Sequence, residues 1–166
     1  MEFQEAKDKF IQAWGTLGTD WGVNRTMAQI HALLLISPES LCAEDIMEEL
    51  KISRGNANMN IRALMSWGLV KKELRPGERK EFFFAEKNMM EVVKKIVSQR
   101  KKKELEPMLQ ALEEVSNSQG ESEEAKEFSK VVRDIHLFSQ KANSTLDTLI
   151  ESDANWLIGS FFKTMK

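Results

Sequence analysis

Residues 22–86 of the chain read GVNRTMAQIHALLLISPESLCAEDIMEELKISRGNANMNIRALMSWGLVKKELRPGERKEFFFAE, and this stretch decides the fold. As far as Gly68, its apolar residues recur at helical spacing, with breaks at Ser37-Pro38 and at Lys51-Ile52. A residue before proline is pushed out of the α region, and Gly68 is placed to end a helix as its C′ residue. The spacing therefore predicts three helices, at 24–36, 43–50 and 53–67.

The last part of the stretch changes from a helical to an extended period. Residues 69–74 and 80–85 are predicted strands, and Pro76 and Gly77 occupy the central positions of the turn between them, which is typical of a type II turn. Two short helices joined by a tight turn and followed by a hairpin form the outline of a winged helix-turn-helix. The predicted fold class is therefore mainly α, with a small antiparallel β-hairpin wing and flanking N- and C-terminal dimerisation helices.

The helix predicted at 53–67 has one apolar and one polar face. Steps of 100° per residue place Ala57, Ile61 and Leu64 together on the apolar face. The polar face carries residue types that read DNA: asparagine pairs with adenine, arginine pairs with guanine, and glycine lets the helix backbone approach a phosphate. The candidate DNA-binding residues of this helix are Ser53, Arg54, Gly55, Asn56, Asn58, Met59 and Arg62.

The alternative is that these residues are ordinary surface groups of an amphipathic helix. However, asparagine occupies positions 56, 58 and 60, and asparagine is a poor helix former. Helix stability does not explain this composition, which favours a function for Asn56 and Asn58. Asn60 lies nearer the apolar face, so we interpret it as a structural hydrogen-bonding residue.

Basic residues gather at the turn of the predicted hairpin. Arg75, Arg79 and Lys80 lie on or next to the turn, where a cationic side chain can enter the minor groove of DNA or bind a phosphate. The alternative is an exposed hairpin whose charges prevent edge-to-edge pairing with other chains. Because the hairpin follows a helix with base-reading residue types, we predict that these three residues bind DNA.

The segments ISRGNANMN, WGLV and PGERKEFFF carry a more specific likeness. Residues 22–86 resemble the MarR-type winged-helix transcription regulators and, among these, the GbsR-type branch. The resemblance implies a homodimer that binds double-stranded DNA as a regulator, here predicted to be a repressor. Relatives act on genes for osmoprotectant uptake and synthesis, and some respond to choline-like ligands. The chain departs from the family pattern at Cys42, where serine is expected; a thiol is a poor cap, so a looser helix start is predicted there.

The segments on either side of the winged helix are also predicted to be helical. The predicted domains are an N-terminal dimerisation helix in residues 1–22 (helical at 2–17), a DNA-binding domain in residues 23–87, and a C-terminal helical dimerisation region in residues 88–166. In the last region, Pro107 should kink or restart its helix, because proline has no N–H to donate to the helical ladder.

A heptad seam runs through the C-terminal region. Its apolar positions alternate by three and four, and they are Phe128, Val131, Ile135, Phe138, Ala142, Thr145 and Leu149. A final helix with further aromatic residues is predicted from Asp153. Together, the flanking helices carry more apolar surface than one winged helix can cover. This surplus predicts an obligate homodimer.

The net charge of −2 conceals an uneven distribution. Residues 1–50 have a net charge of −6, residues 51–103 of +10 and residues 104–166 of −6. A basic block between two acidic ones predicts a polyanionic partner for the middle of the chain. A solvated charged face is the alternative that charge alone leaves open.

Other classes of protein find little support in the sequence. The chain contains no GxSxG or HExxH motif and no Gly-rich phosphate loop, so it is not predicted to be an enzyme. His31 and His136 have no cysteine or acidic cluster at ligand spacing, so no metal and no cofactor is predicted. A single cysteine, an acidic N-terminus and the lack of an apolar run of about 18–20 residues predict a cytoplasmic protein without a membrane partner.

Three further hypotheses stay open at this point. Trp14, Trp21 and Trp156 can form an aromatic cage for the quaternary ammonium group of a small-molecule effector, although core packing is the simpler interpretation. Cys42, near a helix N-terminus, can sense the redox state if its pKa is lowered, although a small buried residue is the simpler interpretation. The chain can also be a winged-helix protein–protein adaptor that binds no DNA and uses the 128–149 seam for its partner.

Overall fold

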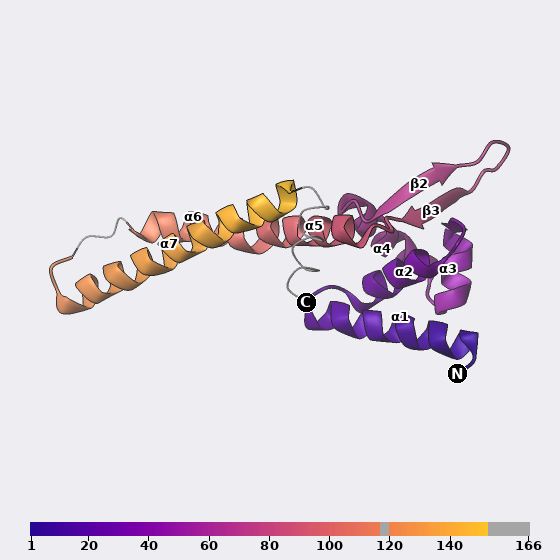
Figure 1. Cartoon of the computed structure of the whole chain (residues 1–166), viewed down its shortest axis with the longest axis horizontal. Helices are drawn as coiled ribbons and strands as arrows, with labels where there is room; N and C mark the ends of the chain where they lie inside the picture. The colour runs from indigo at the N-terminus through magenta and orange to yellow at the C-terminus, as the bar shows by residue number, and fades with distance from the viewer. Residues whose placement is uncertain (117–119, 153–166) are drawn as a thin grey trace, which may run out of the picture. The chain divides into compact units, whose positions relative to one another are not determined.

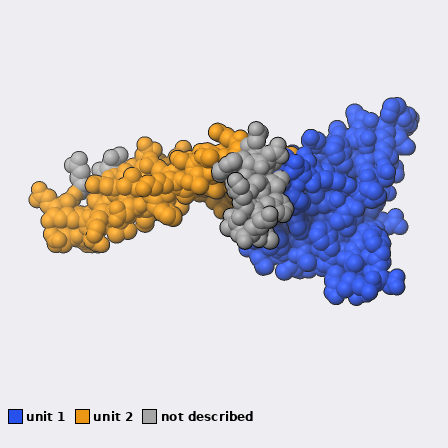
Figure 2. Space-filling model, in the orientation of Figure 1, with its two compact units in different colours: residues 1–92 blue, residues 93–166 orange. Residues whose placement is uncertain are grey.

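The computed structural model describes residues 1–116 and 120–152 (Figure 1). These residues belong to two compact units, 1–92 and 93–166 (Figure 2). The final helix predicted from Asp153 lies outside the described residues. Within them, no helix is both long enough and apolar enough to cross a bilayer.

The first unit is a winged helix. Its elements are α1 (Phe3–Asp20), α2 (Arg25–Ile36), β1 (Leu41–Cys42), α3 (Ala43–Leu50), α4 (Arg54–Ser66), β2 (Val70–Leu74) and β3 (Glu81–Ala85). The strands form an antiparallel sheet in the order β1-β3-β2. The predicted fold class, mainly helical with a small antiparallel wing, is confirmed.

The core of this unit surrounds α2. Ile30, Leu33 and Leu34 of α2 are at most 1% exposed, and Ile46 of α3 and Leu64 of α4 are buried to the same extent. α2 contacts α1, α3, α4 and β3. This helix is apolar around most of its circumference, and such a helix is stable in water only when other elements cover it. The predicted central position of α2 is confirmed.

Side-chain caps define where the helices begin and end. Asn24 Oδ1 accepts a hydrogen bond from the N–H of Met27 at 3.1 Å, and Ser53 Oγ accepts one from the N–H of Asn56 at 3.3 Å. Both bonds satisfy an N–H group that the helix itself leaves without a partner. Gly68 follows α4 with a φ of 73°, a left-handed conformation that glycine adopts without strain. The three helix boundaries predicted from these residues are confirmed.

The sheet has three strands, whereas the sequence predicts only the two of the hairpin. Leu41 and Cys42 pair with Phe83 and Phe82 of β3. A strand of two residues is too short to show an alternating pattern, and its partner strand lies far along the chain. Cys42 also begins α3, and its backbone N–H donates to the Asp45 carboxylate at 2.9 Å. This bond supports the helix start that was predicted to be loose.

α1 extends three residues beyond the helix predicted at 2–17, because Gly18 does not end it. A Cβ on Gly18 would lie 2.5 Å from the Cβ of Ala28, so glycine is needed where α1 and α2 approach each other closely. Gly18 therefore lies inside α1, and its carbonyl accepts a hydrogen bond from the N–H of Val23 at 2.7 Å. The turn is made by Trp21 and Gly22, and Gly22 has a φ of 74°.

The close approach of α1 and α2 leads to a test of stability. Gly18→Ala should lower the free energy of unfolding by about 1–3 kcal/mol, since overpacking a fitted interface costs this much. Adding Ala28→Gly should recover most of the loss. Urea unfolding measures both changes. Gly15→Ala is the control, because its new methyl group would meet mainly the flexible side chain of Gln29. Equal effects of Gly15→Ala and Gly18→Ala would contradict the assigned role of Gly18.

The second unit contains a helical hairpin. The helix α5 (Met89–Arg100) begins in the first unit and continues as a π-helical turn, η1 (Lys101–Leu105), and then as α6 (Glu106–Ser116). α7 (Glu123–Glu151) runs back along α6 and η1 (Figure 1). Ser122 Oγ accepts a hydrogen bond from the N–H of Ala125 at 3.1 Å and caps α7.

The π-helical turn lies directly before Pro107. In this turn the N–H of Glu106 donates to the carbonyl of Lys101, five residues earlier. Proline cannot donate to the ladder and its ring crowds the preceding turn, and a wider turn accommodates both effects. The helix restart predicted at Pro107 thus takes the form of a π turn followed by α6.

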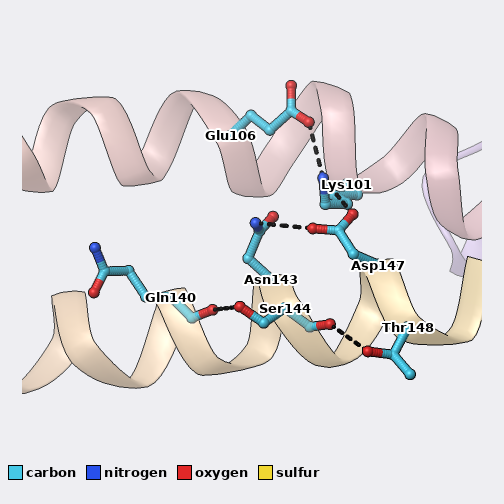
Figure 3. A network of polar contacts seen from close by, with 7 residues as sticks. All are labelled: Lys101, Glu106, Gln140, Asn143, Ser144, Asp147 and Thr148. Carbon is cyan, nitrogen blue, oxygen red and sulfur yellow. Dashed lines mark hydrogen bonds and ion pairs between the residues drawn. The ribbon is translucent and has the colours of Figure 1, made fainter.

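The π turn holds Lys101 between the two helices of the hairpin (Figure 3). Lys101 Nζ lies 3.1 Å from Glu106 Oε1 and 3.0 Å from Asp147 Oδ1, and the Asn143 amide donates to Asp147 Oδ2 at 3.3 Å. The hydrogen bonds to Asp147 and Glu106 raise the pKa of Lys101 above its ordinary value. Polar contacts therefore join the start of η1 to the last turns of α7.

α7 has two seams, and only one of them packs within the hairpin. Val132 and Ser139 are 8% and 4% exposed on the face toward α6. The seam predicted at 128–149 lies about a quarter turn away at 100° per residue. There, Phe128 and Phe138 are 46% and 73% exposed. The described residues thus leave the predicted seam uncovered from Phe128 to Phe138, whereas Ala142 and Leu149 are half-buried.

Candidate nucleic-acid interface

α4 presents its predicted polar face to solvent. Arg62 and Met59 are exposed, and Met59 is 59% exposed. Ala57, Ile61 and Leu64 lie on the opposite side and are buried. The assignment of the two faces is confirmed. Of the other candidate residues, Ser53, Arg54 and Gly55 are exposed, and Asn56 and Asn58 are half-buried.

The asparagines of α4 have different roles. Asn60 is 3% exposed, and its amide donates to the Asn56 carbonyl at 2.9 Å and to Asn56 Oδ1 at 2.7 Å. Asn60 is therefore the structural residue that the sequence predicts. Its bonds also fix the orientation of the Asn56 side chain, whose NH₂ group stays available as a donor. A preoriented side chain loses less conformational entropy when it binds a partner.

Two residues of the polar face have no use within the described part of the unit. A Cβ on Gly55 would have no neighbour within 4 Å, so neither packing nor a turn requires glycine there. Arg62 makes no hydrogen bond or ion pair with any described residue, and neither does Arg79 near the wing turn. Glycine inside a helix costs roughly 0.5–1 kcal/mol relative to alanine. The polar face of α4 is thus not explained by the stability of the fold.

The wing has the predicted turn. Gly77, at the third position of the turn, has a φ of 82°, and the N–H of Glu78 donates to the carbonyl of Arg75 at 3.1 Å. These features are those of a type II turn. Lys72 pairs with Glu81 across the two long strands at 2.7 Å, so that this cation is used within the sheet.

The three predicted basic residues of the wing are in different environments. Arg75 turns back onto the sheet: its Nη2 donates to Ser40 Oγ at 2.6 Å, its guanidinium lies 4.0 Å from the centre of the Phe82 ring, and Nε is 3.5 Å from Glu73. Arg75 therefore supports the wing at the end of β2, next to the turn. Arg79 and Lys80 are exposed on the side of the turn that leads into β3.

One residue of this surface was missed by sequence reasoning. Glu44 of α3 lies 3.0 Å from Arg54 Nη2 and 3.9 Å from Lys80 Nζ. It therefore joins the start of α4 to the start of β3. Sequence spacing carries no signal for this contact, because the three residues belong to different elements that only the tertiary fold brings together.

The structure contradicts the redox hypothesis for Cys42 and does not test the aromatic cage. Cys42 is 3% exposed, and burial together with hydrogen bonding to Asp45 raises the pKa of its thiol, which contradicts the lowered pKa that a redox sensor needs. Trp14 packs against Phe10 and His31, and its Nε1–H donates to His31 Nδ1 at 3.3 Å. Trp21 is 53% exposed, two helical turns further along, and Trp156 lies outside the described residues. The cage therefore stays a prediction. Its proposed member Trp14 already packs against Phe10 and His31.

No protein-family model matches the chain, and no curated protein matches it. Solved structures do resemble it. One, described as a crystal structure of a transcriptional regulator, has a TM-score of 0.67 and 16% sequence identity, over 87% of this chain and 95% of that chain. This chain has the fold of that regulator. Another, a point mutant of S. aureus MepR bound to an oligodeoxyribonucleotide, has a TM-score of 0.42 and 18% identity, over 83% of this chain and 94% of that chain.

The buried His31 makes stability depend on pH. Burial lowers the pKa of His31 from 6.5 to about 4, so the unfolded chain takes up a proton that the folded protein does not. The free energy of unfolding should therefore fall between about pH 6.5 and about pH 4, by up to about 3 kcal/mol from this residue. Urea unfolding at several pH values measures the slope. His31→Gln should flatten it, and an unchanged slope in this variant would contradict the role assigned to His31.

Proposed function

We propose that this protein is a sequence-specific DNA-binding regulator of transcription that acts as a homodimer. The observation that carries the proposal is the polar face of α4, where the described fold exposes Gly55 and Arg62 without using them. An α-helix fits the major groove of B-DNA, about 12 Å wide, and reads bases through side chains of the kinds found on this face. The winged-helix fold and the basic central block of the chain support the same conclusion.

In this proposal the candidate residues of α4 contact either base edges or phosphates, and those of the wing act separately. Asn56, Asn58 and Arg62 contact base edges, where asparagine and arginine bond to adenine and guanine, and Met59 offers an apolar contact to a thymine methyl. Ser53, Arg54 and Gly55 lie at the start of α4, where N–H groups, a hydroxyl and a cation suit a phosphate. In the wing, Arg79 and Lys80 approach the adjacent groove, while Arg75 keeps the wing in position.

The homodimer is supported by the uncovered seam of α7. Besides Phe128 and Phe138, Val131 is 44% and Ile135 is 39% exposed. A phenylalanine side chain has about 150–250 Å² to bury, so the two phenylalanines alone expose on the order of 200 Å². With these neighbours the exposed area comes within the size of the largest apolar patch on a typical monomer, roughly 300–600 Å², and a patch of that size is often a binding surface. Covering this seam with its own copy across a two-fold axis is the simplest solution.

The resemblance to the GbsR-type branch extends the proposal. It supports a cytoplasmic repressor of osmoprotectant genes that responds to a small-molecule effector. The alternative function, a protein–protein adaptor without DNA binding, is favoured by one observation. The seam at 128–149 suits an apolar partner of another sequence as well as a second copy of this chain.

The DNA-binding role is tested by removing one base-reading cation. Arg62→Ala should weaken binding to a duplex selected from a random pool by about 1–3 kcal/mol and relax the preference at one base position. The melting temperature should hardly change, because Arg62 makes no hydrogen bond or ion pair with a residue that the structure describes. Lys141→Ala, which removes an exposed cation of α7, is the control. Fluorescence anisotropy over a series of salt concentrations gives both affinity and salt slope. A shallow slope for the unaltered protein would favour the adaptor.

The homodimer is tested on adjacent residues of α7. Phe138→Glu places a charge on the uncovered seam and should convert the protein to a monomer near 19.1 kDa. Leu137 is 52% exposed but points to the other side of the helix, so Leu137→Glu should stay dimeric. Sedimentation velocity at micromolar concentration distinguishes the two. Unaltered protein that sediments as a monomer and still binds a palindromic duplex tightly would contradict the dimer.

A further inference from the structure

Glu44 occupies the middle of the surface assigned to DNA. One of its carboxylate oxygens lies 3.0 Å from Arg54 Nη2 at the start of α4, and the other lies 3.9 Å from Lys80 Nζ, next to the wing turn. The side chains of Glu44, Arg54 and Lys80 are 39%, 65% and 55% exposed. An acidic group therefore sits between two cations that the proposed function directs at phosphates.

The charge of Glu44 is fixed at neutral pH. Its own backbone N–H and the Cys42 thiol, together with Lys80 and Arg54, hold the pKa of the Glu44 carboxyl below its ordinary value. The negative charge is therefore always present when DNA approaches. Exposed ion pairs of this kind add little to stability, so the fold gains little from the arrangement. A like charge facing an incoming phosphate, by contrast, is unfavourable for binding.

We infer that Glu44 competes with DNA phosphates for Arg54 and Lys80, and thereby weakens binding to non-specific DNA more than binding to the specific site. This inference rests on the proposed function. Non-specific binding depends almost entirely on cations that release counterions from the phosphates. Arg54 and Lys80 share the single negative charge of Glu44, so together they contribute about one charge less to it. Glu44 is then a residue that sets specificity by an unfavourable interaction.

In the complex with the specific site, displacing Glu44 from the two cations costs less than in a non-specific complex. Base contacts by Asn56 and Arg62 hold α4 in the major groove, so that phosphates lie close to Arg54 and Lys80. Exchanging an exposed carboxylate for a phosphate then costs little, because surface pairs are weak and the cations regain a partner. The penalty from Glu44 therefore falls mainly on complexes in which the helix is not seated.

The test compares two isosteric substitutions on the same helix. Glu44→Gln should tighten binding to a random-sequence duplex by roughly three- to tenfold and steepen the salt slope by about one ion. Its affinity for the duplex selected from a random pool by the unaltered protein should change by less than about twofold. Glu48→Gln is the control, because Glu48 is exposed on α3 and changes the net charge equally without touching Arg54 or Lys80.

A second comparison leaves Glu44 in place. Lys80→Gln should weaken binding to the random-sequence duplex less than Arg79→Gln does, because the nearby Glu44 already offsets part of the charge of Lys80. In the Glu44→Gln background the two effects should become equal. The comparison of Lys80→Gln with Arg79→Gln in the otherwise unaltered protein keeps the inference testable if Glu44→Gln fails to fold, which thermal melting followed by circular dichroism would show.

The outcomes separate this inference from the proposed function. Equal effects of Glu44→Gln and Glu48→Gln on the random-sequence duplex would overturn the inference while the protein still binds DNA. Weaker binding of Glu44→Gln to both duplexes would also overturn it, and would make Glu44 a positioning residue for Arg54. Unaltered protein that binds no duplex at low salt would overturn the proposed function, and this inference with it.

Discussion

The burial of α2 is the constraint on which the first unit depends. Its side chains are apolar around most of the helix, so no arrangement that leaves one face in water is stable. α1, α3, α4 and β3 all pack on it, and each contributes its own apolar side. Because Ala57, Ile61 and Leu64 of α4 are used in this way, the opposite face of α4 must point outward. The orientation of the proposed reading helix is thus a consequence of covering α2.

The basic residues of the resulting surface differ in their interaction partners. Arg75 is held by Ser40, Glu73 and the Phe82 ring, and so acts within the sheet. Arg62 has no partner among the described residues, whereas Arg54 and Lys80 share Glu44. Counting basic residues does not separate these cases, although their availability to a polyanion differs. The net charge of +10 of residues 51–103 therefore does not say how many of their cations are free to bind a polyanion.

In the helical hairpin of the second unit, small and polar residues pack between the helices, whereas large apolar residues are exposed. The face of α7 that packs within the chain includes the small residue Ser139 and the polar residue Asn143, whose partner Asp147 also binds Lys101. The bulkier residues, Phe128 and Phe138, lie on the uncovered seam. Small residues allow the two helices of the hairpin to approach, and the polar contacts fix their register. The larger apolar side chains have no packing partner within the described hairpin and can be buried only by another surface.

The sequence by itself determined the helices of the first unit, the type II turn of the wing and the two faces of α4. These features depend on local rules: caps at Asn24 and Ser53, glycines at positions 68 and 77, and the helical period of Ala57, Ile61 and Leu64. Only the tertiary structure decided the third strand at Leu41–Cys42 and the close approach at Gly18. It also decided that Arg75 packs against the sheet and that Glu44 lies between Arg54 and Lys80. Each of these depends on contacts between residues far apart in the chain, and periodicity within a segment carries no information about which distant side chain will lie beside it.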